Sequence, residues 1–290
     1  MKDKLKKLRN LLFICFVLVT AGILFQTQDA QAAKTGCYKL STSKPTKKYD
    51  ITGDGKPDKI EIKKLNKSKD GVFYSYLGYK ILVNGKTIFN STSGYNRLDI
   101  SLIKTKKYSY FKIDEWNCGD IGAIEKIYEY SGKQLKESIS LRNIEKKYEG
   151  WISHYKISSV KAHSIKIKIE GQTGMLGETR SSFELKVGKG GKLSLAKKVV
   201  VVSCKIWSNP NASDNHRVTP KYLTTTKKIQ VYKNEGTTKK AFSIKKGSKV
   251  KITKVSISKK KPTYYCVTKS GKKGWIKSEM YLFENMSYAG

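Results

Sequence analysis

The sequence predicts an all-β fold, and three observations lead to that expectation. Beyond the first 32 residues, the apolar periodicity of a helix is nearly absent. Short runs rich in Ile, Val, Tyr and Thr recur instead, separated by clusters of Gly, Asn, Ser and Lys, as is typical of strands and turns. In Ser164–Glu170 ("SIKIKIE") isoleucines alternate with lysines, which gives a strand one apolar and one solvated face.

The first 32 residues are typical of an export signal. A basic start is followed by an uncharged apolar run, Leu11–Phe25, and then by the small-x-small pattern of Ala30–Ala32. The apolar run is shorter than the about 20 residues that a membrane-spanning helix needs. We therefore expect residues 1–32 to be a cleaved signal peptide and the protein to be extracellular or cell-wall associated. The membrane is an expected partner only if the segment stays uncleaved.

The charge of the chain favours polyanionic partners. The formal net charge is +36, and it becomes +33 without residues 1–32, which contain five basic and two acidic residues. Such a charge opposes self-association and says nothing about fold. Outside a cell the polyanions would be wall polymers or lipid headgroups, so we expect no nucleic acid. The alternative, that the lysines only solvate strand faces, stays open.

The cysteine pattern favours disulfides over zinc. After signal cleavage four cysteines remain, and in an exported chain they allow three pairings, among which the sequence does not choose. Neither a C-x-x-C motif nor a Cys/His cluster is present, which argues against a structural zinc site. The four are Cys37, Cys118, Cys204 and Cys266.

Three aspartates gather in "YDITGDGKPDKIEI", residues Tyr49–Ile62. Three carboxylates at loop positions one, five and nine repel one another unless a cation lies among them. A glycine at the sixth position permits the sharp turn of a calcium loop, in which Ca²⁺ takes six to eight oxygen ligands. A tight turn without metal, leading into a strand, is the alternative.

The same stretch resembles the aspartate-rich calcium loops of secreted repeat proteins of the FG-GAP/VCBS type. The resemblance implies weak calcium binding, with a dissociation constant on the order of 10⁻⁴–10⁻³ M, because Thr52 replaces a carboxylate. Lys56 would contribute only its backbone carbonyl. The implied metal ligands are Asp50, Thr52, Asp54, Lys56 and Asp58.

The following residues read as hairpins. Asn84-Gly85 lies between two apolar runs and favours a type I′ turn. Ser131-Gly132 and Gly188–Gly191 mark two further turns between strand-like runs, and we expect Asp114–Asp120 to be a turn because its spacing fits no calcium loop. The similarity to calcium-loop domains continues over this region. It implies a propeller-like or sandwich β domain, with residues 37–205 as its extent.

Residues 206–220 are expected to be a linker, because Ser208–Lys221 contains two prolines, three asparagines and no apolar run. Residues 221–285 contain about five short strands, and small β units of this size close into barrels. Three stretches carry a resemblance to bacterial SH3-like (SH3b) domains of secreted wall-associated proteins. They are "IQVYKNEG", "FSIKKGSKVKI" and "YYCVTKSGKKGWIKSEMY". The resemblance implies a small barrel that binds an envelope ligand.

Aromatic residues of the last segment are the candidate ligand-binding residues. Tyrosine and tryptophan offer amphipathic contact area at low entropic cost, which suits recognition of sugars or peptides. The alternative is that these rings pack across strands. The candidates are Tyr264, Tyr265 and Trp275.

We expect no catalysis. Cys118 with His154 or His163 lacks a helix N-terminus that would activate the thiol. The carboxylates of Asp114–Asp120 are arranged around a turn and not on facing strands, as glycoside cleavage would require. The sequence therefore predicts a non-catalytic binder of peptidoglycan, anionic wall polymers or another envelope ligand. The alternatives are a cell-wall hydrolase or its accessory subunit, and an extracellular adhesin or receptor ectodomain.

Overall fold

The computed structural model describes residues 34–67, 76–116, 124–195, 198–207, 217–258 and 260–286. Within these ranges almost all regular structure is antiparallel β, with one short α-helix, α2 (Arg142–Tyr148), and one 3₁₀ turn, η1 (Lys189–Gly191). The all-β prediction is therefore confirmed. The expected signal peptide, residues 1–32, lies outside the described residues. In the described part of the chain no helix is both long and apolar enough to cross a membrane.

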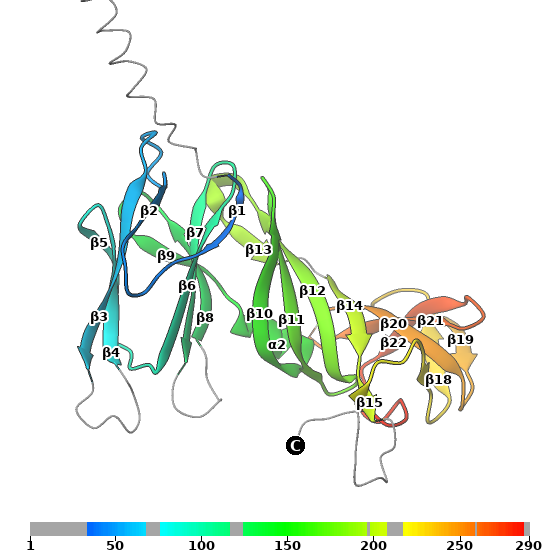
Figure 1. The fold of residues 1–290 in the computed structure, drawn as a ribbon. Coiled ribbons are helices and arrows are strands. Elements are labelled where there is room, and N and C mark those ends of the chain that lie inside the picture. The colour runs from blue at the N-terminus through cyan, green and yellow to red at the C-terminus, as the bar shows by residue number, and fades with distance from the viewer. Residues whose placement is uncertain are drawn as a thin grey trace, which may run out of the picture.

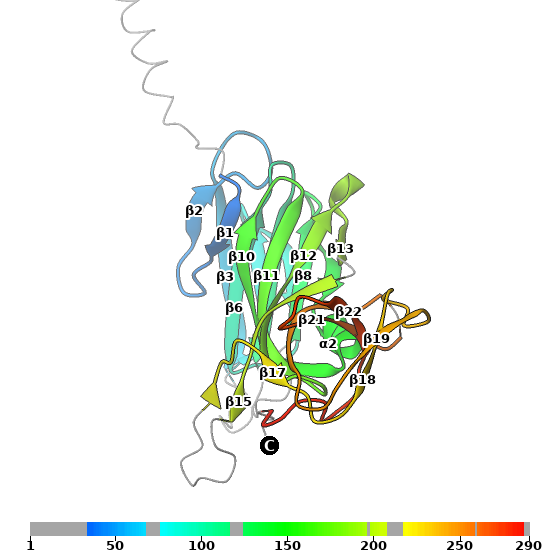
Figure 2. The ribbon, with the colours of Figure 1, turned by 90° about the vertical axis from the view of Figure 1, so that its right-hand side faces the viewer.

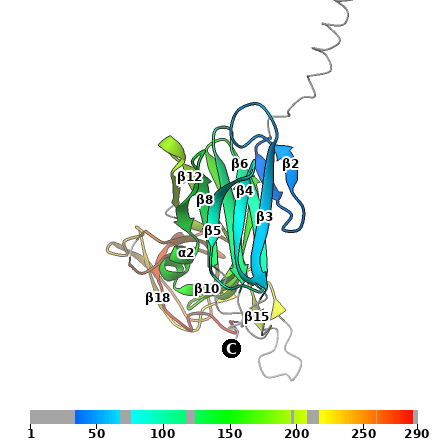
Figure 3. The ribbon, with the colours of Figure 1, turned by 90° about the vertical axis from the view of Figure 1, so that its left-hand side faces the viewer.

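Two smaller sheets form one end of the molecule (Figures 1 and 3). The first sheet is a four-stranded meander whose strands are β2 (Thr46–Tyr49), β3 (Asp58–Lys67), β4 (Tyr76–Val83) and β5 (Lys86–Ser91). The second sheet has the order β1 (Gly36–Lys39), β6 (Arg97–Lys104), β7 (Ser109–Trp116), β8 (Ile124–Tyr130) and β9 (Leu135–Ser140).

The third sheet is the largest and runs into the C-terminal strands. It begins with β10 (Gly150–Val160), β11 (Ser164–Thr173), β12 (Gly177–Val187) and β14 (Lys198–Cys204). It continues through β20 (Lys249–Ser256), β21 (Thr263–Thr268), β22 (Lys273–Lys277), β18 (Ile229–Tyr232) and β19 (Lys240–Ile244). Two short strands join its side, β13 (Leu193–Leu195) on β12 and β17 (Leu223–Thr224) on β20.

The second sheet lies between the other two layers, because it is apolar on both faces. Leu102 and Phe111 belong to the core shared with the first sheet. Ile103 and Tyr110, the neighbouring positions of the same strands, belong to the core shared with α2 and the third sheet. Since side chains alternate across a strand, this two-sided apolar pattern requires a covering layer on each side.

Local sequence explains two of these elements directly. In β11, Ile165, Ile167 and Ile169 are buried while the lysines between them are exposed, so the predicted alternation is confirmed. Asn84 and Gly85 connect β4 to β5 with φ angles of 50° and 81°. Positive φ at both positions is what a type I′ hairpin turn needs.

Within the third sheet, the C-terminal strands join β10–β14 through the pairing of β14 with β20. Lys198 to Val200 pair in antiparallel register with Ser256 to Lys254. At the ends of the expected linker, β15 (Ile206–Trp207) pairs with β16 (Arg217–Val218), and residues 208–216 lie outside the described residues. Figure 2 shows β17–β22 wrapped beside the larger strands. The division into separate domains stays a prediction.

Candidate functional site

The aspartates of residues 50–58 bind the backbone of their own loop. The carboxylate of Asp50 accepts hydrogen bonds from the N–H groups of Gly53 (2.6 Å) and Gly55 (3.0 Å). Asp54 accepts one from the N–H of Lys56 at 2.9 Å. Gly53 and Gly55 both have φ of +82°, a conformation that favours glycine. The turn is therefore built from carboxylate caps and two left-handed glycines.

Asp58 has the most complete set of partners in this loop. Its side chain is buried, and one oxygen accepts from the N–H groups of Ile51 (2.7 Å) and Thr52 (2.9 Å). The other oxygen accepts from the hydroxyl of Thr52 (3.2 Å) and from Nδ2 of Asn84 (2.5 Å). A carboxylate offers about four lone-pair sites. The four donors account for all of them.

Lys104 of β6 brings a positive charge to the same loop. Its Nζ donates to the backbone oxygen of Asp50 at 2.9 Å and to the hydroxyl of Ser109 at 3.2 Å. Burial lowers the pKa of Lys104, and the charges of Asp50 and Asp58 oppose that shift. The chain itself thus supplies a cation close to two of the three mutually repelling aspartates.

No group of three or more His, Cys, Asp or Glu side chains that could hold a metal ion exists within the described residues, which include the whole of 50–58. Thr52 and Lys56, the other two candidate ligands, are exposed. Calcium binding stays a prediction. The alternative of a metal-free turn accounts for every contact of Asp58 given above.

The three candidate ligand-binding aromatics lie on two different faces of the C-terminal strands. Tyr264 is fully buried in the large core and burial raises its pKa. Tyr265, the next residue, points to the opposite face, where its ring contacts that of Trp275 edge-on at a centroid distance of 5.0 Å. The structure therefore brings Tyr265 and Trp275 together and separates Tyr264 from them.

Register extends this pair into a row across five strands, which we call the aromatic ladder. Each member pairs with the next in neighbouring strands, so that their side chains share one face. From β20 to β19 the ladder consists of Lys254, Tyr265, Trp275, Tyr232 and Lys240.

Lysines lie close to the rings of the ladder. Nζ of Lys254 is 5.8 Å from the ring centroid of Tyr265, and Nζ of Lys277 is 5.5 Å from that of Tyr232. Tyr265 and Tyr232 are half-buried, whereas Trp275 is 8% exposed. Rings with accessible faces beside ammonium groups suit stacking on sugars or peptides and attraction to anionic groups.

Sequence reasoning missed Tyr232, although a signal for it was present. Ile229 and Val231 are apolar and buried, so the two-residue period of the strand places Tyr232 on the outer face. What the sequence does not give is the pairing of β18 with β22, and only this pairing puts Tyr232 opposite Trp275.

The acidic residues considered for catalysis are directed apart. Asp114 and Glu115 are neighbours in β7 and therefore point to opposite faces. Asp114 forms an ion pair with Lys112, while Glu115 is buried and accepts a hydrogen bond from the hydroxyl of Tyr79 at 2.5 Å. Asp120 and Cys118 lie outside the described residues, and His154 and His163 are exposed.

The described cysteines do not pair with one another. Cys37 is an exposed free thiol, and Cys204 and Cys266 are buried free thiols. Burial raises the pKa of Cys204 to about 12 and that of Cys266 to about 11. Neither is a thiolate near neutral pH, so neither is activated as a nucleophile.

Comparison of the chain with protein-family models, with curated proteins and with solved structures finds no match. Function is therefore inferred from the residues and their geometry alone.

Proposed function

We propose that this is a secreted, non-catalytic protein that binds the cell wall or another envelope ligand through its C-terminal strands. The observation that carries the proposal is the aromatic ladder. Three rings in register, Tyr265, Trp275 and Tyr232, are bracketed by Lys254 and Lys240 on the outer face of the sheet. Tyr265 and Tyr232 are only half-buried on this face, so part of each ring is accessible to a ligand.

Charge supports the same proposal. Residues 221–290 contain eighteen lysines, no arginine and three glutamates. This excess would draw the C-terminal strands towards an anionic polymer, and the ladder would provide the short-range contact. The electrostatic part should weaken with salt, because the Debye length falls from about 8 Å at physiological ionic strength to about 3 Å at 1 M.

Co-sedimentation of the full chain with isolated cell-wall sacculi tests the proposal. We expect Tyr265→Ala and Tyr232→Ala to weaken binding about tenfold each, as loss of an aromatic anchor typically costs more than about 1 kcal/mol. Tyr281→Ala is the matched control, because Tyr281 is an exposed tyrosine (67%) of the same C-terminal segment outside the ladder. The full chain is needed because β14 pairs with β20.

Absence of sedimentation with sacculi at both low and high salt would refute the proposal. Equal loss of binding in Tyr265→Ala and Tyr281→Ala would show that the aromatic ladder is not the binding surface. A fall in the turbidity of the sacculi would point instead to a wall hydrolase.

A further inference from the structure

Two neighbouring hairpin turns of the C-terminal strands border an open pocket that shares no residue with the aromatic ladder. One turn, residues 245–248, joins β19 to β20, and the other, residues 269–272, joins β21 to β22. The N–H of Lys269 donates to the backbone oxygen of Lys249 at 2.9 Å and ties the turns together. The space between them has a volume of about 360 Å³, and we call it the turn pocket.

The turn pocket is lined by positive charge. Lys245, Lys249, Lys269 and Lys272 all line it, all four are exposed, and no carboxylate is among the lining residues. In the part of the chain that the structure describes, none of the four forms an ion pair, whereas Lys227 nearby in sequence pairs with Glu279. An anion bound in the pocket would be stabilised by the charges of these ammonium groups.

Hydroxyl groups provide donors beside these charges. Ser243, Ser248, Thr268 and Ser270 line the pocket, with the hydroxyl oxygens of Thr268 and Ser270 3.0 Å apart. Hydroxyls and ammonium groups are the donors that phosphate oxygens accept from. The pocket therefore combines charge with directional hydrogen bonding.

The turns that hold the pocket depend on glycine for conformation. Gly247 and Gly271 have φ of 75° and 87°. A Cβ built at either position would meet no atom within 4 Å, so the need for glycine comes from the backbone conformation and not from crowding. The two turns remain tight, and space is left open around them.

Besides Ser243, β19 contributes two apolar residues to the lining of the pocket. Phe242 is half-buried and Ile244 buried, and Nζ of Lys272 is 5.9 Å from the ring centroid of Phe242. Among the described residues, the exposed large hydrophobic side chains lie outside the pocket. Without such side chains at its rim, the pocket lacks a means of inserting into a lipid layer. It offers apolar contact to the carbon skeleton of a ligand that carries anionic groups.

Lysine, and not arginine, supplies the charge. Residues 221–290 contain no arginine. Arginine matches planar carboxylates and phosphates with a rigid fork, whereas lysine acts as a compact point charge on a flexible stem. Flexible lysines beside serine and threonine hydroxyls suit repeated phosphate groups that can bind in more than one position, as in a polymer.

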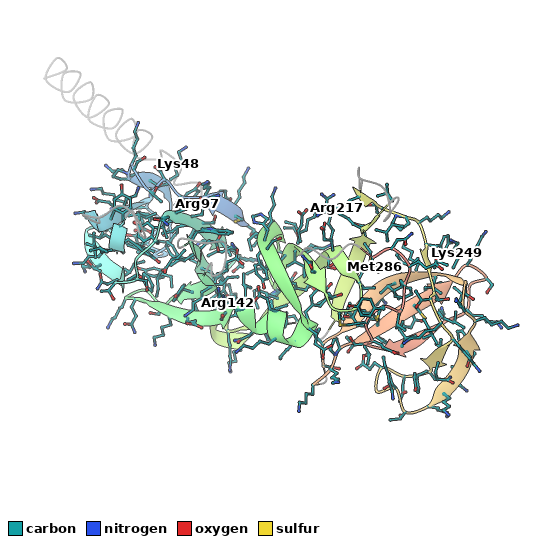
Figure 4. All side chains as sticks on the ribbon, turned by 90° about the horizontal axis from the view of Figure 1, so that it is seen from below. Lys48, Arg97, Arg142, Arg217, Lys249 and Met286 are labelled. Carbon is teal, nitrogen blue, oxygen red and sulfur yellow. The ribbon has the colours of Figure 1, made fainter. Side chains whose placement is uncertain are left out.

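From these observations we infer that the turn pocket binds the phosphate groups of a phosphodiester-linked polyol polymer, with the carbon units of the polymer against Phe242. Its volume of about 360 Å³ is within the about 300–1,000 Å³ of ligand sites. The inference deepens the proposed function by naming a polymer class and a second contact. Figure 4 shows that Lys249 lies among the C-terminal strands, at the other end of the molecule from Lys48.

Binding of the full chain to poly(glycerol phosphate) tests the inference. The variant Lys249→Gln/Lys269→Gln should bind about 10- to 100-fold more weakly at 0.15 M salt, as expected for loss of contacts to a charged group. Lys228→Gln/Lys233→Gln removes the same charge from exposed positions outside the pocket and the ladder, and should weaken binding less than about threefold. Ser270→Ala keeps the charge and should still weaken binding several-fold.

Lys249 also donates to the hydroxyl of Thr224 at 2.6 Å, so Lys272→Gln serves as a second pocket variant that leaves this contact intact. Equal weakening in the pocket and control variants would overturn the inference, because binding would then follow total charge. Equally tight, Lys249-dependent binding to phosphatidylglycerol vesicles would also overturn it, in favour of a lipid headgroup.

The two proposals fail in different ways. If the full chain does not sediment with sacculi but binds the polymer through the pocket, envelope binding is refuted and the pocket is supported. Sacculus binding that is lost in Tyr265→Ala and retained in the pocket variants, with the polymer bound equally by the pocket and control variants, would refute the pocket alone.

Discussion

Asp58 shows how one buried carboxylate organises a loop and two strands. It lies at the start of β3, 1% exposed, and receives donors from both the loop and the β4–β5 turn. We expect Asp58→Asn to lower the free energy of unfolding by about 2–4 kcal/mol, because an amide places its NH₂ group against backbone donors. Asp54→Asn, at an exposed position with one acceptor contact, should cost less than about 0.5 kcal/mol. Urea denaturation measures both, and equal losses would contradict the assignment.

The Asp54→Asn protein, compared with the unsubstituted chain, also tests calcium binding. If the loop binds the ion, added calcium must raise the melting temperature of the unsubstituted chain, and Asp54→Asn must abolish that increase. Identical melting with calcium and with chelator would leave the hydrogen-bonded turn as the whole explanation of the aspartates.

Glu125 of β8 predicts a pH dependence of stability. It is 4% exposed, and its pKa is raised to about 8, chiefly by burial. The charges of Lys112 and Arg142 lower this pKa, and those of Asp114 and Glu145 raise it. The folded state keeps a proton that the unfolded state loses near pH 4.5. The stability that Glu125 contributes is therefore fully present below pH 4.5. It falls as the pH rises above 4.5 and is lost once the pH has risen through about 8.

Glu125→Gln should therefore leave stability unchanged at pH 4 and increase it by on the order of 4 kcal/mol at pH 8. Chemical denaturation at the two pH values measures the difference. A gain of the same size at both values would show that the effect is unrelated to the proton.

At the scale of elements, the two-residue period explains both the successes and the gaps of the sequence analysis. It identified β11 and the Asn84-Gly85 hairpin, because their signals are local. It could not say that Tyr264 faces the core and Tyr265 the ladder, since either parity fits an isolated strand. Only the register with β20 and β22 fixes which side is inside.

Helix α2 was missed for a related reason. Seven residues are too few to give a repeated apolar stripe, and only Ile144 and Tyr148 are buried, one turn apart. The turn pocket was also beyond reach, because its two turns lie some twenty residues apart and meet only through the pairing of β20 with β21. Both features depend on contacts between segments distant in sequence.

At the scale of the whole molecule, the cores predict cooperative unfolding. One cluster of buried residues includes strands of the second sheet, α2, the third sheet and β17–β22, and the other lies on the opposite face of the second sheet. We expect a single calorimetric transition. Ile113→Ala in one core and Ile252→Ala in the other should each lower it, at a cost of about 2–5 kcal/mol. Two transitions, each sensitive to only one substitution, would contradict this expectation.

The pairing of β14 with β20 bears on how the rest of the protein would be positioned relative to a bound polymer. The ladder and the turn pocket belong to strands that share backbone hydrogen bonds with the layers, and Figure 1 shows the first sheet at the far end of the molecule. A molecule attached by its C-terminal strands would then act as a stiff spacer. It would hold the aspartate loop, residues 50–58, at a fixed distance and angle from the surface to which the C-terminal strands are bound.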